Sequence, residues 1–322
     1  MGNGMEHTTS TPKKFSPTFL ENETRLDARP LTIEKLPEWR NRVTSRTREP
    51  RFPTGITGLD SLLWGVHPGE LMIIGARPSQ GKTSLACQMA WNLASKTDAF
   101  VLYFSLEMSS ESVIERLFCL DQKVSGYKLR TGIIPSDFEK KYEHFKDRMM
   151  IAKLEIFDNI GWTRDQIGDA LEWALGPKGA TNPIVFIDHV QMCSSKGYSS
   201  KQEALADYIR GLNEFATKYN ASVIATSQIS RAGSGDESMD YLKGSGELEE
   251  AASTIVNCRW CVRCTGKEIY SSDPKKYICD VVKQRHGPTD RVIVSYEADT
   301  FTFGEYQEQD FRVPPPWGGL PV

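Results

Sequence analysis

The chain of 322 residues lacks the features of a membrane or secreted protein. No apolar run approaches the roughly 18–20 residues that cross a bilayer, and the mean hydropathy is −0.42. The first ten residues, MGNGMEHTTS, contain no apolar core of a signal peptide. Glu6 stands where a myristoylation signal requires Ser or Thr. These absences predict a cytosolic protein without a membrane partner.

An excess of charge of one sign is also absent, because 39 basic residues stand against 42 acidic ones, a net charge of −3. This balance excludes a protein whose whole surface is basic enough to attract nucleic acid. Any contact with phosphates must therefore come from a local basic patch. The seven cysteines are an odd number in a chain of this length, so they do not predict a disulfide framework.

Three of the cysteines have a spacing that invites a metal interpretation. Cys258, Cys261 and Cys264 form a C-x₂-C-x₂-C pattern, which resembles half of an iron–sulfur signature. They fall on an expected strand, where side chains alternate, so Cys261 points away from the other two. No fourth ligand stands at the expected distance. We therefore predict that these three, and Cys279 on the next expected strand, are structural.

Composition divides the chain into four segments. Residues 1–30 are rich in Thr, Pro, Ser and charge, and are predicted to be a flexible arm. Residues 31–51 form a linker, in which 37–48 are expected to be a short amphipathic helix; a solvated linker is the alternative. Residues 52–306 have the pattern of a folded domain. The remaining segment, 307–322, is a Pro/Gly-rich tail that ends FRVPPPWGGLPV.

The folded segment alternates apolar strands with helices. Strands are expected over 70–76, 99–107, 182–190 and 221–228, and helices over 82–95, 111–118, 136–150, 163–176 and 201–219. Ser136 with Glu139, and Thr163 with Gln166, have the spacing of a capping box at a helix start. Strands that are apolar throughout and separated by helices predict an α/β fold, with a mainly parallel sheet covered on both faces.

The pattern changes after residue 250. Strands are expected over 253–263, 275–284, 291–298 and 300–303, with short turns such as HGPTD between them. Strands joined by short turns pair antiparallel. We therefore predict an antiparallel extension at the C-terminal end of the sheet.

The sequence GARPSQGKT, residues 75–83, lies between an expected strand and an expected helix. In that context a Gly-rich loop binds phosphates, because its backbone N–H groups and the helix N-terminus point at the anion. Lys82 can reach the β- and γ-phosphates, and the Thr83 hydroxyl can ligate Mg²⁺. Ala76 occupies the first glycine position of the usual pattern, and the alternative is a Gly/Lys turn without a ligand. The candidate nucleotide-binding residues are Ala76, Arg77, Pro78, Ser79, Gln80, Gly81, Lys82, Thr83 and Ser84.

Three polar residues stand at the C-terminal ends of other expected strands, the edge where ligands bind in such sheets. Asp188 ends PIVFID and is the candidate second metal residue; alone it would be a cap or turn residue. Glu107 follows VLYFSL and is either a base that activates water or an acid favoured by a helix N-terminus. Gln228 follows SVIATS and either senses the γ-phosphate or caps its strand.

Six motifs stand in one order along the chain: GARPSQGKTSLACQMAWNLA, YFSLEMSSE, VFIDHVQM, SQISR, GSGELEEAAS and VKQRHGPT. In order and spacing the chain resembles the ATPase domain of DnaB-type replicative helicases, from about Phe52 to Phe303. The family's loop has the form G-A-R-P-S-x-G-K-T, which accounts for Ala76. The resemblance implies a RecA-like P-loop ATPase fold and a ring-forming, ATP-dependent DNA helicase that translocates on single-stranded DNA and unwinds a replication fork.

The resemblance also implies roles for individual residues. Lys82 and Thr83 would bind the triphosphate and Mg²⁺, Glu107 would be the catalytic base and Asp188 the metal-site acid. Gln228 would report the γ-phosphate state to the loops that hold DNA. In KQRHG, Lys283 and Arg285 would reach the nucleotide of the neighbouring subunit in a hexameric ring; without the family they are a solvated strand end.

DNA would pass through the centre of the ring, held by SSKGYSSK and by RAGSGDESMDYLKGSG, which otherwise are surface loops. A basic inner wall is compatible with a net charge of −3. In place of the family's L-R-E-S-G stands L-K-G-S-G, which keeps a cation and a glycine and loses the acidic residue. The candidate DNA-binding residues are Arg231, Lys243, Gly244 and Gly246.

The front of the chain departs from the family, because about fifty residues are too few for the helical N-terminal domain that forms a collar and contacts primase. Expected partners are therefore DNA, further copies of the chain, and a primase or helicase loader. One alternative is a RadA-like branch-migration ATPase; no Cys₄ zinc module precedes the P-loop here, and F-S-L-E-M is of the replicative type. Another is a nucleotide-binding ring that regulates or loads a different helicase.

Overall fold

A computed structural model describes residues 36–44, 52–158, 161–229, 246–261 and 273–307. Contacts divide the chain into two units, residues 1–48 and 49–322. In the first unit the structure describes one helix, α1 (Leu36–Thr44), where the sequence predicts a helix over 37–48. Its residues Leu36, Trp39 and Val43 are exposed. No helix of the described residues is long and apolar enough to span a membrane.

The second unit is built on one sheet of nine strands in the order β3-β2-β4-β5-β1-β6-β7-β8-β9. From β3 to β6 the neighbouring strands are parallel, and from β6 to β9 they are antiparallel. The strands are β1 (Leu71–Ala76), β2 (Phe100–Ser105), β3 (Leu154–Asp158), β4 (Pro183–Asp188), β5 (Ser222–Gln228), β6 (Thr254–Trp260), β7 (Lys276–Gln284), β8 (Arg291–Glu297) and β9 (Thr302–Glu305). The α/β fold with a mainly parallel sheet is therefore confirmed.

The antiparallel extension begins one strand later than the sequence predicts. Strand β6 pairs parallel with β1, with Met72 opposite Thr254 and Ala76 opposite Cys258, and antiparallel with β7. A parallel neighbour requires a crossover rather than a hairpin. The segment between β5 and β6, which includes helix α9 (Gly246–Ala251), makes that crossover. The sequence predicted that residues 253–263 belong only to the antiparallel extension. This prediction is wrong on one side of β6, where the strand pairs parallel with β1.

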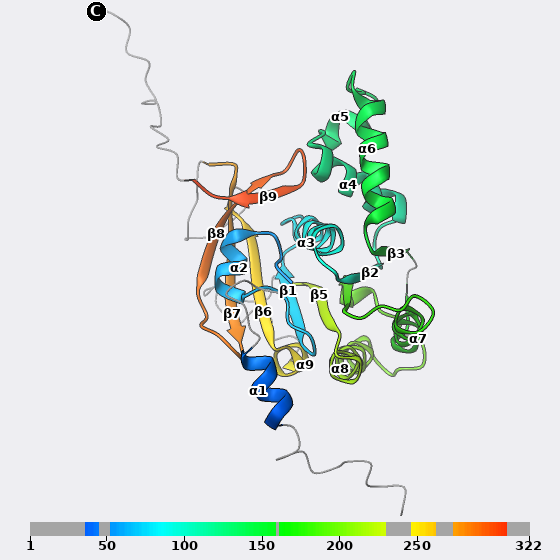
Figure 1. The fold of residues 1–322 in the computed structure, drawn as a ribbon, viewed down its shortest axis with the longest axis vertical. Coiled ribbons are helices and arrows are strands. Elements are labelled where there is room, and N and C mark those ends of the chain that lie inside the picture. The colour runs from blue at the N-terminus through cyan, green and yellow to red at the C-terminus, as the bar shows by residue number, and fades with distance from the viewer. Residues whose placement is uncertain (1–35, 45–51, 159–160, 230–245, 262–272, 308–322) are drawn as a thin grey trace, which may run out of the picture. The chain divides into compact units, whose positions relative to one another are not determined.

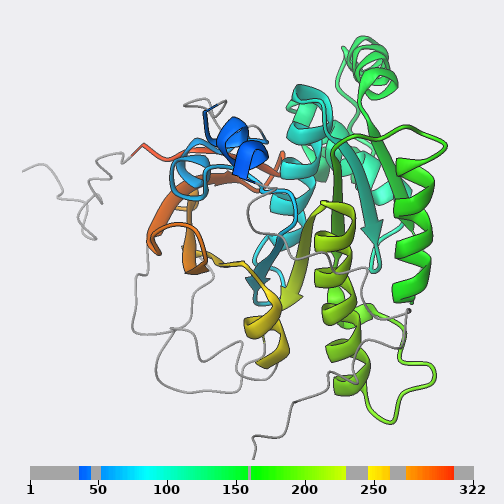
Figure 2. The same cartoon turned by 60° about the horizontal axis from the view of Figure 1, so that its bottom comes forward.

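Helices cover both faces of the sheet (Figure 1). Helices α3 (Lys82–Lys96), α4 (Ser110–Gln122) and α6 (Phe138–Ile151) lie on one face, and α7 (Arg164–Leu175) and α8 (Lys201–Tyr219) lie on the other. Figure 2 shows α7 and α8 in front of the strands from a second direction. The shorter helices are α2 (Thr57–Leu63), α5 (Gly126–Arg130) and the 3₁₀ turn η1 (Val190–Met192).

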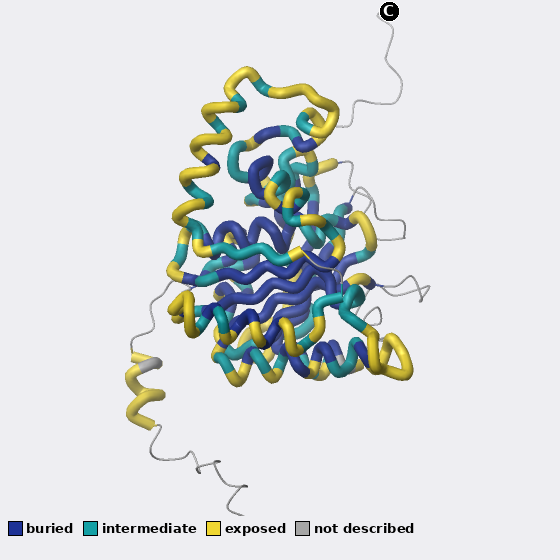
Figure 3. The backbone as a smooth tube through the Cα atoms, turned by 90° about the vertical axis from the view of Figure 1, so that its right-hand side faces the viewer, coloured by how far each residue is buried: buried dark blue, intermediate teal, exposed yellow. Residues whose placement is uncertain are grey.

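Two apolar clusters lie against the two faces. Along β1, Met72 and Ile74 belong to the cluster beneath α3, whereas Leu71 and Ile73 belong to the cluster beneath α7 and α8. All six residues of β1 are buried, as the alternation of side chains on a doubly covered strand requires. Figure 3 shows these buried strands between helices whose outer sides are exposed.

The two expected capping boxes have different outcomes. At α7 the Thr163 Oγ1 accepts from Gln166 N at 3.3 Å, and Thr163 N donates to Gln166 Oε1 at 2.9 Å, which confirms the box. At α6 the prediction from Ser136 is wrong, because the helix begins two residues later with Asp137 at its N-cap. Pro135 accounts for the delay, since its carbonyl accepts from Phe138 N in a turn before the helix.

This difference predicts unequal effects of two similar substitutions. Thr163→Ala removes an N-cap acceptor and should lower the free energy of unfolding by about 1 kcal/mol. Ser136→Ala is the matched control, because Ser136 is exposed and does not cap a helix, and should change it by less than about 0.5 kcal/mol. Urea unfolding followed by circular dichroism measures both. Equal losses in the two variants would contradict the helix starts described here.

Candidate active site

The predicted phosphate-binding loop joins the end of β1 to the start of α3. Ala76 is the last residue of β1, and Gly81 precedes Lys82 at the N-cap of α3 with φ +88°. Glycine suits this left-handed conformation, which L side chains rarely adopt. The loop therefore ends at a helix N-terminus whose backbone N–H groups are suited to an anion. Pro78 and Ser79 are exposed, whereas Arg77 and Thr83, the latter in the first helical turn, are half-buried.

Two predicted nucleotide-binding side chains hold the loop from inside. Gln80 is buried, and its Oε1 accepts from Trp260 N of β6 at 2.6 Å. Ser84 is buried, and its Oγ accepts from Arg116 Nη1 at 2.8 Å and from the Tyr296 hydroxyl at 3.1 Å. The side chains of Gln80 and Ser84 are thus committed to the protein interior. Only the backbone groups of these two residues remain suited to binding a ligand.

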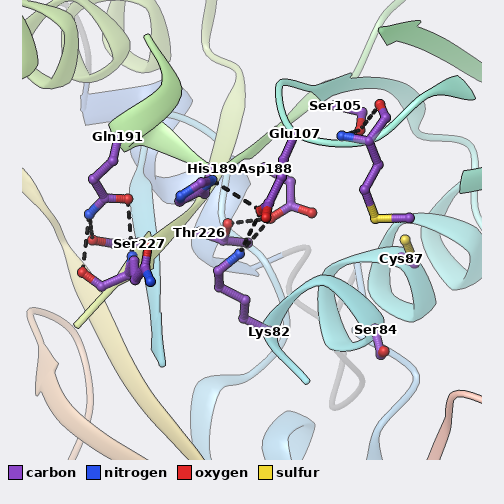
Figure 4. Close-up of polar contacts among 12 residues, drawn as sticks. Lys82, Ser84, Cys87, Ser105, Glu107, Asp188, His189, Gln191, Thr226 and Ser227 are labelled. Carbon is purple, nitrogen blue, oxygen red and sulfur yellow. Dashed lines mark hydrogen bonds and ion pairs between the residues drawn. The ribbon is translucent and has the colours of Figure 1, made fainter. Parts of the chain in front are cut away.

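Three charged side chains from separate elements meet beside this loop (Figure 4). Lys82 Nζ lies 3.5 Å from Glu107 Oε2 and 3.6 Å from Asp188 Oδ1. The exposed fraction of the side chain is 11% for Lys82, 2% for Asp188 and 53% for Glu107. The arrangement joins a buried carboxylate to a solvent-accessible one through a single ammonium group. The sequence predicted these three residues for one site, and the structure brings them together.

Asp188 is held by hydroxyl groups from both neighbouring strands. The Thr226 hydroxyl of β5 donates to Oδ1 at 2.5 Å, and the Tyr103 hydroxyl of β2 donates to Oδ2 at 3.2 Å. Burial raises the pKa of Tyr103 well above its usual value, as does the negative charge of Asp188. Tyr103 therefore stays protonated and remains a donor. Buried charges are tolerated when they are paired and hydrogen-bonded, which describes Asp188.

The turn after β2 fixes the position of Glu107. Ser105 Oγ donates to Met108 O at 2.7 Å, and Leu106 N donates to Asp188 O at 2.7 Å, so this turn is tied to the end of β4. Helix α4 begins only at Ser110, with Ser109 as its N-cap. Glu107 thus lies before the helix, which argues against the alternative that it is an acid of the first helical turn.

His189 belongs to the site and was missed by the sequence interpretation. It is buried, and its Nδ1 lies 3.4 Å from Glu107 Oε2. Burial lowers the pKa of His189, and the positive charge of Lys82 lowers it further, while Glu107, Asp188 and a hydrogen bond with Gln228 oppose the shift. The neutral imidazole is favoured. Its position directly after Asp188 in FIDHV was the available signal.

Gln228 ends β5 at the same edge, as predicted, and is exposed. Gln191, which the sequence interpretation also missed, connects it to β4. Gln228 N donates to Gln191 Oε1 at 3.0 Å, and Gln191 Nε2 donates to Ser227 Oγ at 2.8 Å and to Gln228 O at 3.2 Å. Gln228 therefore has contacts through its backbone with η1 and through its side chain with His189.

Lys283 and Arg285 lie level with the start of β1, whereas Lys82 follows its end, so the two groups are at opposite ends of the strands. Gln284 is opposite Thr254, which is opposite Met72 near the start of β1, whereas the phosphate loop follows the end of β1. Both cations contact the last turn of α9: Lys283 Nζ donates to Glu249 O, and Arg285 Nη2 donates to Glu250 O at 3.2 Å. Cations are favoured at a helix C-terminus. Four residues of strand, about 13 Å, already separate this pair from the loop within one chain.

Most of the predicted DNA-binding residues fall on 230–245, so Arg231, Lys243 and Gly244 lie outside the described residues. Gly246 is the first residue of α9 and is exposed. The second candidate loop, 194–201, follows η1 at the edge that carries Asp188. Lys196 is exposed there, and the Tyr198 hydroxyl donates to Asp207 Oδ2 at 2.8 Å.

The cysteines with iron–sulfur-like spacing do not converge on a metal site in the described part of the chain. Cys258 of β6 is opposite Cys279 of β7, with sulfurs 3.8 Å apart, and both are buried. Cys261 is buried just beyond the end of β6, and Cys264 lies outside the described residues. No group of three His, Cys, Asp or Glu side chains that could hold a metal was found among the described residues.

The charges around His189 predict its titration. The NMR pKa of its imidazole should lie below the usual 6.5, because burial penalises the charged ring. Lys82→Ala removes a positive neighbour and should raise that pKa, whereas Glu107→Gln removes a negative one and should lower it. Exposed His286 serves as the internal control. Shifts of the same sign in both variants would contradict the geometry of the three groups.

Comparison with known proteins identifies the family. The model of the DnaB-like helicase C terminal domain matches residues 52–305. The replicative DNA helicase DnaC of Bacillus subtilis is 29% identical over 275 residues, which cover 82% of this chain and 59% of the relative. The replicative DNA helicase DnaB of Leifsonia xyli subsp. xyli is 31% identical over 252 residues, 76% of this chain and 54% of the relative. The chain thus covers less than two thirds of the length of these relatives.

Solved structures agree on the fold. A structure described as an ATPase domain superposes with a TM-score of 0.77 at 24% identity, covering 85% of this chain and 98% of that one. A DnaB-like replicative helicase, described with its interactions with primase, superposes with a TM-score of 0.76 at 24% identity, covering 85% and 68%. The recognised motifs, the RecA-like sheet and the family match agree: this chain belongs to the DnaB-like helicase C-terminal domain family.

Proposed function

We propose that this chain is the motor of a ring-forming DNA helicase that hydrolyses ATP with Mg²⁺, translocates on single-stranded DNA and unwinds forked duplex. The observation that carries the proposal is the meeting of Lys82, Asp188 and Glu107 beside the phosphate-binding loop. The family match and the names of the relatives support it.

The residues at the loop fit a magnesium-bound triphosphate. Thr83 offers a hydroxyl in the first turn of α3 and Asp188 a carboxylate, and oxygen atoms are what Mg²⁺ prefers. Thr83 and Asp188 would hold the ion, and bound Mg²⁺ would neutralise part of the charge of the phosphates. Lys82 here contacts the carboxylates of Glu107 and Asp188. The phosphates of a bound nucleotide would replace these carboxylates as its partners. Asp188 keeps its hydrogen bonds with Thr226 and Tyr103 in that exchange, so its position does not depend on Lys82 alone.

Glu107 has the properties of a base for hydrolysis. Its carboxylate is half-exposed, so water can reach it, and the turn that carries it is bound to the end of β4. General bases of this kind contribute about 10²–10⁴ in rate. Neutral His189, 3.4 Å away, limits where the carboxylate can move. Gln228, bound to His189 and Gln191, connects this site to residues 230–245, where we propose that Arg231 and Lys243 hold DNA.

The positions of Lys283 and Arg285 support the proposal that a second copy of the chain completes the nucleotide site. Lys283 and Arg285 are separated from the phosphate loop of their own chain by the length of β1. We propose that they act on the nucleotide of the neighbouring subunit, where a cation stabilises the charge of the phosphoryl transition state.

The first test separates nucleotide binding from hydrolysis. Lys82→Ala should lose ATP binding, whereas Glu107→Gln should keep it and hydrolyse ATP about 10²–10⁴ times more slowly. Binding is measured with a fluorescent ATP analogue, and unwinding by strand displacement on forked DNA with ATP and with a non-hydrolysable analogue. Active hydrolysis without strand displacement would contradict the helicase proposal, and equal loss of ATP binding in both variants would contradict the division of roles.

The second test concerns Arg285. Homogeneous Arg285→Ala rings should lose about 10³–10⁵ in hydrolysis rate. Rings mixed from Arg285→Ala and Glu107→Gln subunits should regain part of it, because some interfaces join an intact Glu107 to a neighbour's intact Arg285. Native mass spectrometry confirms that the rings are mixed. Mixed rings no more active than the two parents would show that Arg285 does not act across an interface.

The third test concerns the hold on DNA. Each phosphate neutralised on single-stranded DNA contributes about 0.7 to the slope of log K against log salt. Lys243→Ala, present in every subunit of a hexamer, should therefore flatten the slope by several such units and weaken all sequences alike. Hydrolysis without DNA should persist. Lys196→Ala in the other loop is the matched comparison, and if it alone changes the slope, residues 194–201 hold the DNA instead.

A further inference from the structure

An open cleft of about 330 Å³ lies beside the edge strand β3, outside the nucleotide site. It lies on the face covered by α7 and α8, because its aromatic residues pack against the apolar cluster of that face. We call it the aromatic cleft; its lining residues are Phe157, Trp162, Gln166, Asp169, Ala170 and Trp173. Phe157 has Trp162 and Trp173 edge-on at 5.5 and 6.4 Å between ring centroids. Three large rings thus hold a half-buried apolar surface in place.

The polar groups of the aromatic cleft are a donor and a charge. The buried indole Nε1 of Trp162 has no acceptor among the described residues. Asp169 is exposed on α7 and makes no ion pair with any residue that the structure describes. In contrast, Lys178, which lies over the Trp173 ring, is paired with Glu155 at 2.9 Å. The cleft therefore lacks a carbonyl for the indole and a cation for Asp169.

These features together match one class of occupant. Proline-rich segments bind aromatic-lined grooves as polyproline II helices. Such a helix makes no internal hydrogen bonds, so its carbonyls are available to an indole N–H. Its conformation is largely preset in the free chain, which reduces the entropy lost on binding. A cation beside the prolines would pair with Asp169.

This chain contains such a segment in its own tail. Residues 312–317 read RVPPPW, with three consecutive prolines, an arginine before them and an aromatic residue after them. Arg312 supplies the cation, the prolines supply free carbonyls and rings for the aromatic surface, and Trp317 adds apolar area. The segment lies outside the described residues.

The length of the tail points to the cleft of another copy. Strand β9 is at the opposite edge of the sheet from β3, eight strand spacings or about 38 Å along the sheet. Nine residues lead from Glu305 to Pro314 and span at most about 32 Å. The path to the chain's own cleft is longer still, because Phe303 of β9 packs on the α3 face whereas the cleft is on the α7 face. In Figure 1, β9 lies at the upper left of the molecule and α7 at the lower right.

We propose that residues 312–317 of one copy bind the aromatic cleft of a second copy, with Arg312 beside Asp169. The contact uses neither ATP nor DNA, so its test is independent of the helicase proposal. A partner's proline-rich segment and the chain's own tail are the competing occupants.

Photo-crosslinking in the full-length protein identifies the occupant. Val313→p-benzoylphenylalanine keeps the arginine, the prolines and Trp317, and this chain is mixed with a ¹⁵N-labelled chain without the photoreactive residue. Native mass spectrometry first confirms that mixed assemblies form. The expected result is a crosslink from the light tail to heavy peptides that contain Phe157, Trp162 or Trp173. Crosslinks confined to light peptides in mixed assemblies, or located outside the cleft, would overturn the proposal.

Substitutions in the heavy chain test the chemistry of the contact. Trp173→Ala should reduce the crosslink yield at least tenfold, as loss of a central aromatic anchor does. Asp169→Lys should reduce it about fivefold, and Arg312→Glu in the light chain should restore it, which a folding defect cannot do. Asp147→Lys on exposed α6 makes the same charge change away from the cleft and should leave the yield unchanged. An Asp169→Lys loss that Arg312→Glu does not restore would overturn the assigned pair.

Discussion

The buried carboxylate of Asp188 is the constraint around which the candidate active site is organised. A charge taken out of water is destabilising unless it is paired and hydrogen-bonded, and here one ammonium group and two hydroxyl groups meet that need. The partners come from β2, β5 and the start of α3 after β1. The neighbouring order β2-β4-β5-β1 brings all of them to one carboxylate, so the strand order itself serves the site.

The same sheet separates two sets of charges. The carboxyl ends of the parallel strands hold Lys82, Asp188 and Glu107, where loops are free to bind ligands. Lys283 and Arg285 lie at the other end, against the last carbonyls of α9. The antiparallel direction of β7 causes this separation, because its C-terminal end runs to the start of β1. In the proposed ring, a second copy would bring the two sets together.

The sequence was sufficient where one local pattern determined the structure. Strands β1, β2 and β4 are apolar over most of their length because both faces of the sheet are covered there, and GARPSQGKT defined the loop. Strand β3 and helices α2 and α5 were missed, since they are short and carry polar or charged residues. Strand order is not encoded by spacing along the chain. It determines the pairing of β6 with β1 and the contacts of four site residues: Tyr103, Thr226, His189 and Gln191.

The two proposed contacts between copies are both heterologous, since each joins different surfaces of the two partners. Such contacts close into rings or continue as filaments, depending on the rotation between copies. The Arg285 contact demands a defined rotation, because a guanidinium must reach a phosphate. The tail contact leaves seven residues, 306–312, between β9 and Val313, so it constrains distance more than rotation. A linked contact of this kind raises the effective concentration of the neighbour without setting its angle. The Arg285 contact would therefore determine whether the ring closes. The tail contact would keep two subunits together while the Arg285 contact forms and breaks.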